Sequence, residues 1–393
     1  MVLFLHNRYR TTGGEERAVE DLMWLVREQL GEPAELLTRD SAAIGNAGAA
    51  LGLLRGGVRP EEVAKAVRLS GARVVHAHNL HPAFGWRALA AARSAGARVV
   101  LHLHQYRLVC AIGVCFTRGE ECTRCHGRDT LPGVRLNCRG SRGEAVAYAT
   151  ALALWQRRLV EQAEEILVPS VFARERLRAL GAPLPWERVR VLAPPLPELS
   201  SAGAAARGST VQPFAAAQGA APYALVVSRL AVEKGVDVAV EACRIAGMPL
   251  VVAGDGPELE SLRRRAAGAD VRLLGRVDDA TLAQLRAGAA VALAPSRSAE
   301  TFGLAVAEAM AAGLPVAASR TGAIAELLGE DQDALVPPGD APALAGAIAR
   351  LAGDTQAGRR NLERVRAVCA PEIVAAGLGA AYGGGGRQAQ PRT

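Results

Sequence analysis

Residues 223–256 read YALVVSRLAVEKGVDVAVEACRIAGMPLVVAGDG and contain the pattern that decides the fold. Two short apolar runs, Tyr223–Ser228 and Pro249–Gly254, flank a stretch whose apolar residues recur at helical spacing. Continuous Val, Leu and Ala runs separated by a helix are typical of parallel strands that are covered on both faces. The stretch therefore predicts a strand, a crossover helix and a second, parallel strand.

The same alternation extends over most of the chain. In the second half, further apolar runs lie at Val271–Gly275, Ala290–Ala294 and Pro315–Ser319. In the first half, the runs are Val2–His6, Arg73–His78, Arg98–His104, Ile166–Pro169 and Val189–Ala193. A chain of 393 residues is too long for one ordinary core. We therefore expect an α/β protein with two doubly wound parallel-sheet domains that face each other across a cleft.

Composition sets the expected domain boundaries. Residues 197–222 consist mainly of Ala, Gly, Ser and Pro, which is typical of a flexible linker. We expect one domain over residues 1–196 and another over residues 223–370, followed by a helix at 371–382 that packs back toward the first domain. The glycine-rich end, residues 383–393, is expected to be disordered.

Charge and hydropathy narrow the class of partner. The formal net charge is +7, and the excess of basic residues lies in residues 1–196. That asymmetry indicates an anionic partner of the first half, either a molecule or a membrane surface. The sequence contains no compact module of basic and aromatic residues of the kind that binds nucleic acid, so nucleic acid is not an expected partner. The sequence contains neither a long uncharged apolar stretch nor a signal-peptide pattern at its start, so we expect a cytoplasmic protein, with the inner face of the membrane as an alternative location.

Polar residues and glycines follow each apolar run of the second half. In an open parallel sheet the carboxyl ends of the strands meet at one crevice, where ligands bind. Arg229 and Lys234 offer two positive charges for adjacent phosphates, and the backbone at Gly303 opens a helix whose N-terminus favours an anion. Glu308 and Glu300 could accept hydroxyl groups of a ribose and of a sugar. The other residues expected in this crevice are Gly254, Asp255, Arg276, Val277, Ser296, Thr301, Phe302 and Leu304. Each feature alone also fits a solvated loop or ordinary helix capping.

Five segments in this order carry a resemblance to a known family. They are SRL at 228–230 with EKG at 233–235, AGDGP at 253–257, LGRV at 274–277, PS at 295–296 and ETFGLAVAEAMAAG at 300–313. In these five segments the chain resembles glycosyltransferase family 4. The members of that family are retaining enzymes that use sugar nucleotides and have the GT-B architecture of two Rossmann-like domains. The resemblance implies that Arg229 and Lys234 bind the diphosphate, Glu308 the ribose and Glu300 the donor sugar. It also implies that the backbone at Phe302–Leu304 holds phosphate and that the backbone near Val277 faces the base.

The first half fits the same resemblance. Gly13 and Gly14 follow the first strand, where glycine lets backbone N–H groups approach a phosphate or the acceptor, although a plain tight turn is the alternative. His104 ends the run Arg98–His104 and resembles the histidine that the family places beside the donor sugar. The other histidines on these runs, His76, His78 and His102, are expected to be packed or hydrogen-bonded.

The resemblance implies chemistry without a covalent intermediate and without a metal. The donor diphosphate would leave and the acceptor would attack on one face of the sugar, with the leaving phosphate taking the acceptor proton. The residues assigned to catalysis are His104, Glu300, Arg229 and Lys234, with Glu300 positioning the sugar. The acidic triplet at 331–333 follows a predicted helix rather than a strand, and so is expected to be an exposed loop.

The region between residues 107 and 142 carries a cluster of cysteines and seven arginines. Cys110, Cys115, Cys122, Cys125 and Cys138 suggest a structural zinc site, but a second closely spaced pair is missing, which favours unbonded loop thiols. The arginines indicate a phosphorylated or lipid-linked acceptor or an anionic membrane, and a solvated loop explains them equally well.

Two other functions remain as alternatives. Sugar-nucleotide epimerases share this two-domain architecture, and a non-catalytic nucleotide-sugar binder would share the crevice. The pairing of two glutamates with Arg229 and Lys234 favours transfer. The donor is expected to be a nucleoside-diphosphate sugar, and the acceptor a glycan, a lipid-linked saccharide or a small molecule.

Overall fold

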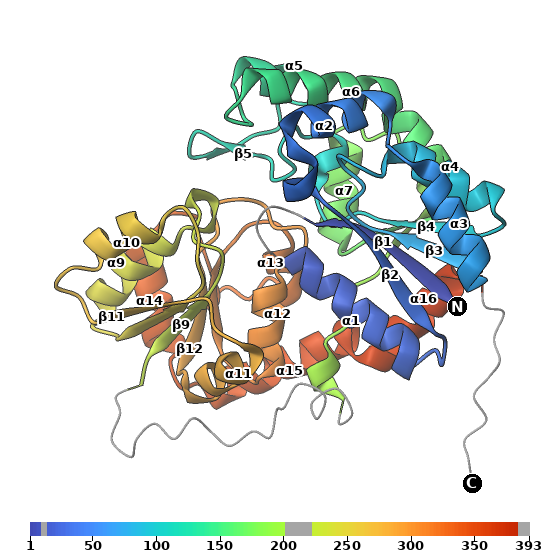
Figure 1. Ribbon diagram of the computed structural model, residues 1–393. Helices are drawn as coiled ribbons and strands as arrows, with labels where there is room; N and C mark the ends of the chain where they lie inside the picture. The colour runs from blue at the N-terminus through green and yellow to red at the C-terminus, as the bar shows by residue number, and fades with distance from the viewer. Residues whose placement is uncertain (9–13, 201–221, 384–393) are drawn as a thin grey trace, which may run out of the picture.

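The computed structural model describes residues 1–8, 14–200 and 222–383, and these form two α/β halves (Figure 1). The expected linker and tail fall largely outside these ranges, at 201–221 and 384–393. The first residues of the expected linker are ordered, because Pro197–Leu199 forms a short 3-10 helix in which Pro197 is buried.

The first half is built on a six-stranded parallel sheet with the order β2-β1-β3-β4-β7-β8. Its strands are β1 (Val2–Arg8), β2 (Ala34–Asp40), β3 (Val74–Ala77), β4 (Arg98–His102), β7 (Glu165–Val168) and β8 (Val189–Val191). Its helices are α1 (Gly14–Glu28), α2 (Ser41–Arg55), α3 (Pro60–Ser70), α4 (Gly85–Ser94) and α7 (Val171–Ala179). Because β4 ends at His102, His104 lies in the loop beyond the strand rather than at its last position.

The second half has a six-stranded parallel sheet with the order β11-β10-β9-β12-β13-β14. Its strands are β9 (Ala224–Val227), β10 (Leu250–Ala253), β11 (Val271–Gly275), β12 (Val291–Ala294), β13 (Val316–Ser319) and β14 (Leu335–Val336). Its helices are α9 (Val236–Ala246), α10 (Leu259–Arg265), α11 (Asp279–Gly288), α12 (Leu304–Ala311), α13 (Ala323–Leu328), α14 (Ala341–Leu351) and α15 (Thr355–Cys369). This confirms the doubly wound α/β class for both halves.

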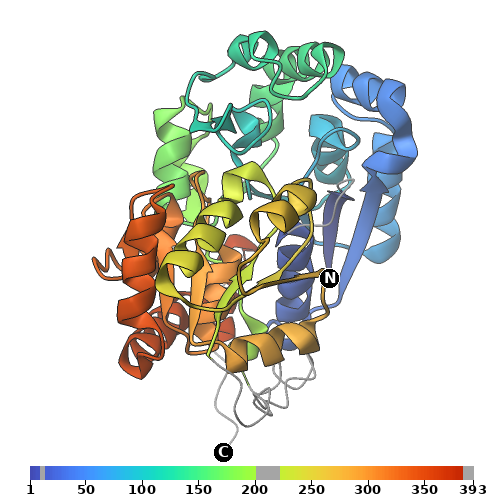
Figure 2. The same ribbon diagram turned by 90° about the vertical axis from the view of Figure 1, so that its left-hand side faces the viewer.

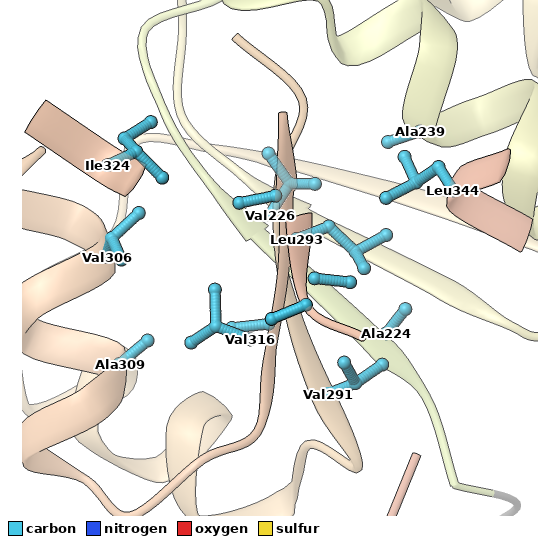
Figure 3. Close-up of a cluster of buried hydrophobic side chains, with 14 of the residues drawn as sticks. Ala224, Val226, Ala239, Val291, Leu293, Val306, Ala309, Val316, Ile324 and Leu344 are labelled. Atoms are coloured by element: carbon cyan, nitrogen blue, oxygen red, sulfur yellow. The ribbon is translucent and has the colours of Figure 1, made fainter. Parts of the chain in front are cut away.

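The core of the second half lies on both faces of its sheet. Alternate residues of each strand point to opposite faces. Val226, Leu293 and Val316 sit on the central strands, while Val306 and Ile324 come from helices on one side and Leu344 from a helix on the other (Figure 3). These side chains are almost fully buried. Burial on two faces explains why the strands are continuous apolar runs in the sequence.

Residues between β4 and β7 form an excursion from the first sheet. It contains the two-stranded ribbon of β5 (Phe116–Thr117) and β6 (Glu120–Glu121), then α5 (Leu131–Arg135) and α6 (Arg142–Glu161). The side chain of Ser141 caps α6 by accepting a hydrogen bond from the backbone N–H of Glu144. In Figure 1 the excursion forms the top of the molecule, above the first sheet.

The last described helix, α16 (Pro371–Ala381), crosses from the second half to the first. Its residues Val374 and Leu378, with Tyr382 directly after it, pack against Phe4 and Leu22 of the first half in one buried cluster. Figure 1 shows this red helix lying beside the blue elements α1, β1 and β2, and in Figure 2 the second half stands in front of it. The chain thus ties its two halves together with its own C-terminal helix.

Candidate active site in the cleft between the halves

A cleft of about 1220 Å³ lies between the two halves and is lined by residues of both. On the second half it lies at the carboxyl ends of β9, β10 and β12. β9 and β12 are neighbours in the sheet, and the strand order reverses between them. In open α/β sheets this reversal point is where ligands bind, because the loops on its two sides diverge and leave a crevice.

Lys234 and Glu300 meet at this point. The Nζ of Lys234 donates to Oε1 of Glu300 over 2.6 Å, and the hydroxyl of Ser296 donates to the same oxygen over 2.7 Å. Burial opposes ionisation of Glu300, but Lys234, Ser296 and the charge of Arg229 outweigh it and hold the pKa of that carboxyl below its usual value. Glu300 is therefore an anion with one oxygen already fixed by two donors.

Arg229 follows β9 and forms an ion pair with Glu233 within the same loop. Its side chain is 45% exposed, so it borders the cleft rather than filling it. With Lys234 it forms a cationic rim on the loop after β9. Gly235, which ends this loop, has a φ of 63°, and a Cβ there would lie 2.1 Å from the carbonyl oxygen of Pro295. Only glycine lets the two loops approach so closely.

Glu308 lies on α12 and is paired with Arg286 of α11. Both side chains are nearly buried, at 11% and 10% exposure, and both line the cleft. The sequence reasoning overlooked Arg286, because a basic residue in the last turn of a helix also fits the ordinary preference of that position for a cation. Only the packing of α11 beside α12 makes it the partner of Glu308.

The N-terminus of α12 points its first backbone N–H groups at the cleft from Gly303. This residue has a φ of 92°, a conformation that favours glycine. Phe302 is buried beneath it, and Leu304 borders the cleft. Thr301 joins the halves, because its hydroxyl donates to the carbonyl oxygen of His104 over 2.8 Å and its own carbonyl accepts from Ser170 over 2.7 Å.

The loop after β10 brings Gly254 and Asp255 to the cleft. Gly254 has a φ of 151°, and a Cβ there would lie 1.8 Å from the carbonyl oxygen of Ser228. The carboxylate of Asp255 accepts a hydrogen bond from the N–H of Gly256 over 2.7 Å. The loop after β11 adds Arg276 and Val277, and Arg276 is exposed.

On the first half, Gly14 opens α1 at the edge of the cleft, whereas Gly13 lies outside the described residues. Near it, Arg17 donates to both carboxylate oxygens of Asp279, each over 2.6 Å, which links α1 to α11 across the cleft. Burial opposes the charge of Arg17, but the hydrogen bond to Asp279 together with the negative charges of Asp21, Glu308 and Asp279 outweighs it and raises the pKa of Arg17. The position of α1 thus affects the helix that carries Arg286.

His104 lies at the boundary between the halves, and its ring packs against a stack of buried histidines. Its Nε2 is 2.7 Å from Nδ1 of His78, and its ring stacks on that of His102 at 4.2 Å. His76 lies next to His78, and its Nδ1 is 2.8 Å from the hydroxyl of Tyr382. Burial lowers the pKa of all four imidazoles. The stack is therefore neutral at pH 7, and its half-buried end, His104, lines the cleft.

Within the described part of the chain, the cysteines do not come together as a zinc site, which is the weaker of the two expectations for them. In the ranges that the structure describes, the only group of three or more residues with potential metal-ligand atoms within 4.8 Å of one another is His76, His78 and His102. Cys110, Cys115, Cys122, Cys125 and Cys138 are free thiols around a small cavity. Cys110 is hydrogen-bonded to Cys115, which lowers the pKa of Cys110 to about 6.

The histidine group is also a poor metal site as it stands. The rings of His76 and His102 stack with an angle of only 6° between their planes. The coordinating lone pair of an imidazole lies in the plane of its ring, so two stacked parallel rings do not point at one ion. The acidic triplet is away from the cleft, and its Asp331 accepts a hydrogen bond from the N–H of Asp333 over 3.0 Å. Within the described ranges, no helix is long and apolar enough to span a membrane.

Two family models match the chain. The model described as Glycosyl transferase 4-like domain matches residues 12–195, and the model described as Glycosyl transferases group 1 matches residues 221–354. The boundary between the two matches coincides with the boundary between the two sheets.

Curated proteins match over shorter stretches. A GDP-mannose-dependent alpha-(1-6)-phosphatidylinositol dimannoside mannosyltransferase of Mycobacterium tuberculosis is 38% identical over 145 residues, which are 35% of this chain and 38% of that protein. A sulfoquinovosyl transferase of Arabidopsis thaliana is 36% identical over 124 residues, which are 30% of this chain and 24% of that protein. The matched region thus spans well under half the length of these relatives.

Solved structures match over nearly the whole chain. Sucrose-phosphate synthase from Thermosynechococcus elongatus has a TM-score of 0.66 and 21% identity, with 97% of this chain and 98% of that chain covered. HepE of Anabaena in complex with UDP-glucose has a TM-score of 0.62 and 18% identity, with 96% and 98% covered. At these identities the likeness shows a shared two-domain fold.

Proposed function

Because the chain belongs to glycosyltransferase family 4, whose two domain models match residues 12–195 and 221–354, we propose that it transfers a sugar from a nucleoside-diphosphate sugar to an acceptor with retention of configuration. Its GT-B fold of two Rossmann-like halves is the premise of this proposal. The observation that carries it is the meeting of Lys234, Glu300 and Ser296 at the reversal point of the second sheet, beside the N-terminus of α12.

The chemistry of these groups suits a departing diphosphate. Lys234 and Arg229 would offset the charge that develops on the leaving phosphate oxygens, and the first N–H groups of α12 would add donors and the positive end of a helix dipole. Such groups act without a metal ion, which is why we propose metal-independent transfer. Glu300, held as an anion by Lys234, keeps its second oxygen for sugar hydroxyls. Glu308, held by Arg286, would accept the ribose hydroxyls.

The transfer step follows from retention without a protein nucleophile. The bond between the anomeric carbon and the diphosphate oxygen breaks, and a bond from that carbon to the acceptor oxygen forms on the same face. The acceptor proton passes to the departing phosphate oxygen. His104, at the boundary of the halves, would contact the donor sugar. Orientation in a closed cleft and stabilisation of the leaving group then supply the rate enhancement.

The printed names of the relatives suggest donors and acceptors to try first. The mycobacterial relative is named for GDP-mannose and phosphatidylinositol dimannoside, and HepE was solved with UDP-glucose. We propose a nucleoside-diphosphate hexose as donor and a saccharide, lipid-linked or small-molecule acceptor. A lipid-linked acceptor would bring the protein to the inner membrane face as a peripheral protein.

The test is thermal stabilisation by the diphosphates of uridine, guanosine, cytidine, adenosine and thymidine, each with and without EDTA. A ligand at about 100 times its dissociation constant stabilises a protein by about 2.7 kcal/mol, a shift of several degrees in Tm. We expect one base to stand out, its shift to survive EDTA, and Glu308→Gln to abolish it. The matched control is Glu260→Gln on exposed α10, which should keep the shift. If no nucleotide stabilises the protein, the proposed donor site is wrong.

Product analysis then separates transfer from epimerisation. The nucleotide that stabilises the protein identifies the sugar nucleotides to assay. Incubated with one of these and an acceptor mixture, a transferase releases the nucleoside diphosphate and forms a glycoside of retained configuration. Conversion of the sugar nucleotide into its epimer would instead assign the protein to the isomerases.

A further inference from the structure

Besides Arg17 of α1, two arginines from separate segments of residues 107–142 line the first-half wall of the cleft. Arg107 lies just after β4, in the short 3-10 helix Tyr106–Leu108, and Arg139 lies just before α6. Both line the cleft, together with His81 from the loop after β3 and Tyr148 from α6. We call these four residues the arginine pocket.

Arg139 is held in place by three contacts. Its Nη1 donates to the carbonyl oxygen of Ala111 over 3.0 Å, and its guanidinium lies over the Tyr148 ring, 4.4 Å from the ring centroid. Its Nη2 is 3.5 Å from a carboxylate oxygen of Glu144, a longer contact. Its Nε is buried and has no hydrogen-bond partner among the residues that the structure describes. A fixed guanidinium with an unused buried donor is suited to a ligand that supplies an acceptor oxygen.

Arg107 is fixed through its neighbours in the loop. Its Nη2 donates to Oε1 of Gln105 over 3.2 Å, and the side-chain amide of Gln105 donates in turn to Glu15 over 2.7 Å. Gly113 packs over Arg107, since a Cβ there would lie 3.3 Å from the Arg107 Cβ at a φ of 83°. Glycine at this position therefore lets the loop pack directly against Arg107.

Both arginines line the cleft with two aromatic side chains, His81 and Tyr148. The His81 ring lies 5.6 Å from the Tyr148 ring that Arg139 covers. Burial and then the charges of Arg107 and Arg139 lower the pKa of His81 to about 4. Neutral His81 can donate or accept a hydrogen bond without adding charge. Two arginines on the same wall of the cleft, beside a neutral polar side chain, can bind phosphate oxygens.

The remaining arginines between residues 107 and 142 do not share this environment. They are exposed and do not line the cleft: Arg118, Arg124, Arg128, Arg135 and Arg142. The basic charge of this region is thus divided into a solvated set and two cleft residues. Arg142, the first residue of α6, is a matched control for the cleft pair because it belongs to the same region and is exposed.

The pocket is close to the place where transfer would occur. Arg107 follows His104 by three residues, a separation of at most about 11 Å along the chain. The carbonyl of His104 accepts the Thr301 hydroxyl from the opposite wall, so His104 marks the point where the halves meet. An anionic group in the pocket would therefore belong to the acceptor molecule and lie roughly one sugar unit from the transferred sugar.

We propose that Arg107 and Arg139 bind a phosphate group of the acceptor, so that the enzyme glycosylates a phosphorylated sugar or polyol. This inference rests on the proposed transferase function and names the class of its acceptor. The phosphate can be a monoester on a soluble acceptor or a diester in a lipid headgroup, because both present the same oxygens to the guanidinium groups.

The experiment measures binding of two kinds of phosphate in parallel. One arm titrates glucose 1-phosphate, glucose 6-phosphate and myo-inositol 1-phosphate by calorimetry in the presence of the nucleoside diphosphate that stabilises the protein best. The other arm uses sedimentation with phosphatidylcholine vesicles that do or do not contain phosphatidylinositol. We expect binding in one arm, reduced at least tenfold in Arg107→Gln and in Arg139→Gln and unchanged in Arg142→Gln. Binding in the first arm identifies a soluble acceptor, and binding in the second alone identifies a lipid headgroup.

Nucleotide stabilisation checks the variants and separates the two proposals. A glutamine variant that keeps the nucleotide-induced Tm shift is folded. If a glutamine variant does not fold, Arg107→Lys or Arg139→Lys is tested in its place. Absence of phosphate binding in both arms with an intact nucleotide shift overturns the acceptor inference alone, as does binding that depends on Arg142 as much as on the cleft pair. Absence of a nucleotide shift in the unmodified protein contradicts the donor site itself.

Discussion

Three acidic side chains in or beside the cleft are each paired with a different basic side chain. Glu300 is held by Lys234, Glu308 by Arg286 and Glu233 by Arg229. A carboxylate held in this way has a fixed orientation at a partly buried site. For Glu300 and Glu308, the pairing also means that loss of the basic partner leaves a largely buried carboxylate without compensation.

The pair of Glu308 and Arg286 is the place to measure this effect. Both side chains are about nine-tenths buried. Arg286→Met should lower the free energy of unfolding by about 3 kcal/mol, because a buried ion pair that loses one partner leaves an uncompensated charge. It should also weaken nucleoside-diphosphate binding, because Glu308 would no longer be fixed. Urea denaturation and the nucleotide-induced Tm shift give the two readouts.

A double variant serves as the control. Arg286→Met with Glu308→Leu removes both charges and should recover part of the lost stability without recovering nucleotide binding. A double variant less stable than Arg286→Met alone would show that the pair does not act through its charges.

The residues that share the crevice were predictable, but their pairings were not. Strand ends in a parallel sheet meet at one edge, so the positions of Lys234, Glu300 and Glu308 after their apolar runs were enough to group them. The partner of Glu308 comes from α11, twenty-two residues earlier in the chain, and depends on how two helices pack. No local pattern marks Arg286, so only the tertiary structure reveals it.

Apart from the small ribbon of β5 and β6, the two strands that the sequence analysis did not predict, β2 and β14, lie at the edges of the two main sheets. β2 has only two buried residues in seven, and β14 consists of two residues. β2 is covered less than a central strand, which weakens its apolar run, whereas β14 is buried but too short to form a recognisable run. The central strands, which are buried on both faces, all occur where the apolar runs predict them.

Helix α16 is attached to the first sheet by polar bonds as well as by apolar packing. Tyr382 lies just beyond the helix, and its hydroxyl is 2.8 Å from Nδ1 of His76. The backbone carbonyl of Tyr382 accepts a hydrogen bond from Arg73 over 2.9 Å. Arg98 donates to the carbonyl of Ala381 over 2.9 Å. These bonds fix the C-terminal helix to β3 and β4 in the first half.

Tyr382→Phe should destabilise the protein by about 1–3 kcal/mol. The ring stays in the core, but the buried Nδ1 of His76 loses its partner, which costs more than the net value of an ordinary hydrogen bond. Tyr223→Phe is the control, because its hydroxyl donates to the Leu285 carbonyl over 2.8 Å at a partly exposed site and its loss should cost less. Equal effects in chemical denaturation would contradict a special role for the bond between Tyr382 and His76.

At the scale of the whole molecule, the two halves are held on both sides of the cleft. On one side Arg17 binds Asp279, and on the other Thr301 bonds to His104. The carboxylate of Glu326 also accepts from the backbone N–H groups of Val171 and Phe172 at the start of α7, over 3.1 and 2.8 Å. The first half therefore contributes to the geometry of the cleft as well as to its lining.

The buried histidines of the first half make its stability depend on pH. Burial is the first cause of a lowered pKa in each of them, to about 3 for His76, to about 4 for His81 and well below the usual value for His78 and His102. In the unfolded chain a histidine has a pKa of about 6.5. Between these values the unfolded chain binds more protons than the folded protein, so stability rises with pH in this range and is lost as pH falls below 6.5.

We therefore expect the free energy of unfolding to fall between pH 6.5 and 4.5, by up to about 1.4 kcal/mol per pH unit for each buried histidine. The lowered pKa of Glu300 adds an effect of the same sign only at lower pH, where carboxyl groups of the unfolded chain take up protons. His102→Leu removes one such histidine, so the free energy of unfolding of this variant should fall less steeply as the pH is lowered. Val100→Ala, a core change on the same strand, should lower stability at every pH and leave the slope unchanged. Urea denaturation at intervals across this range measures the slopes, and equal slopes for His102→Leu and the unmodified protein would show that the histidine stack is not the source of acid sensitivity.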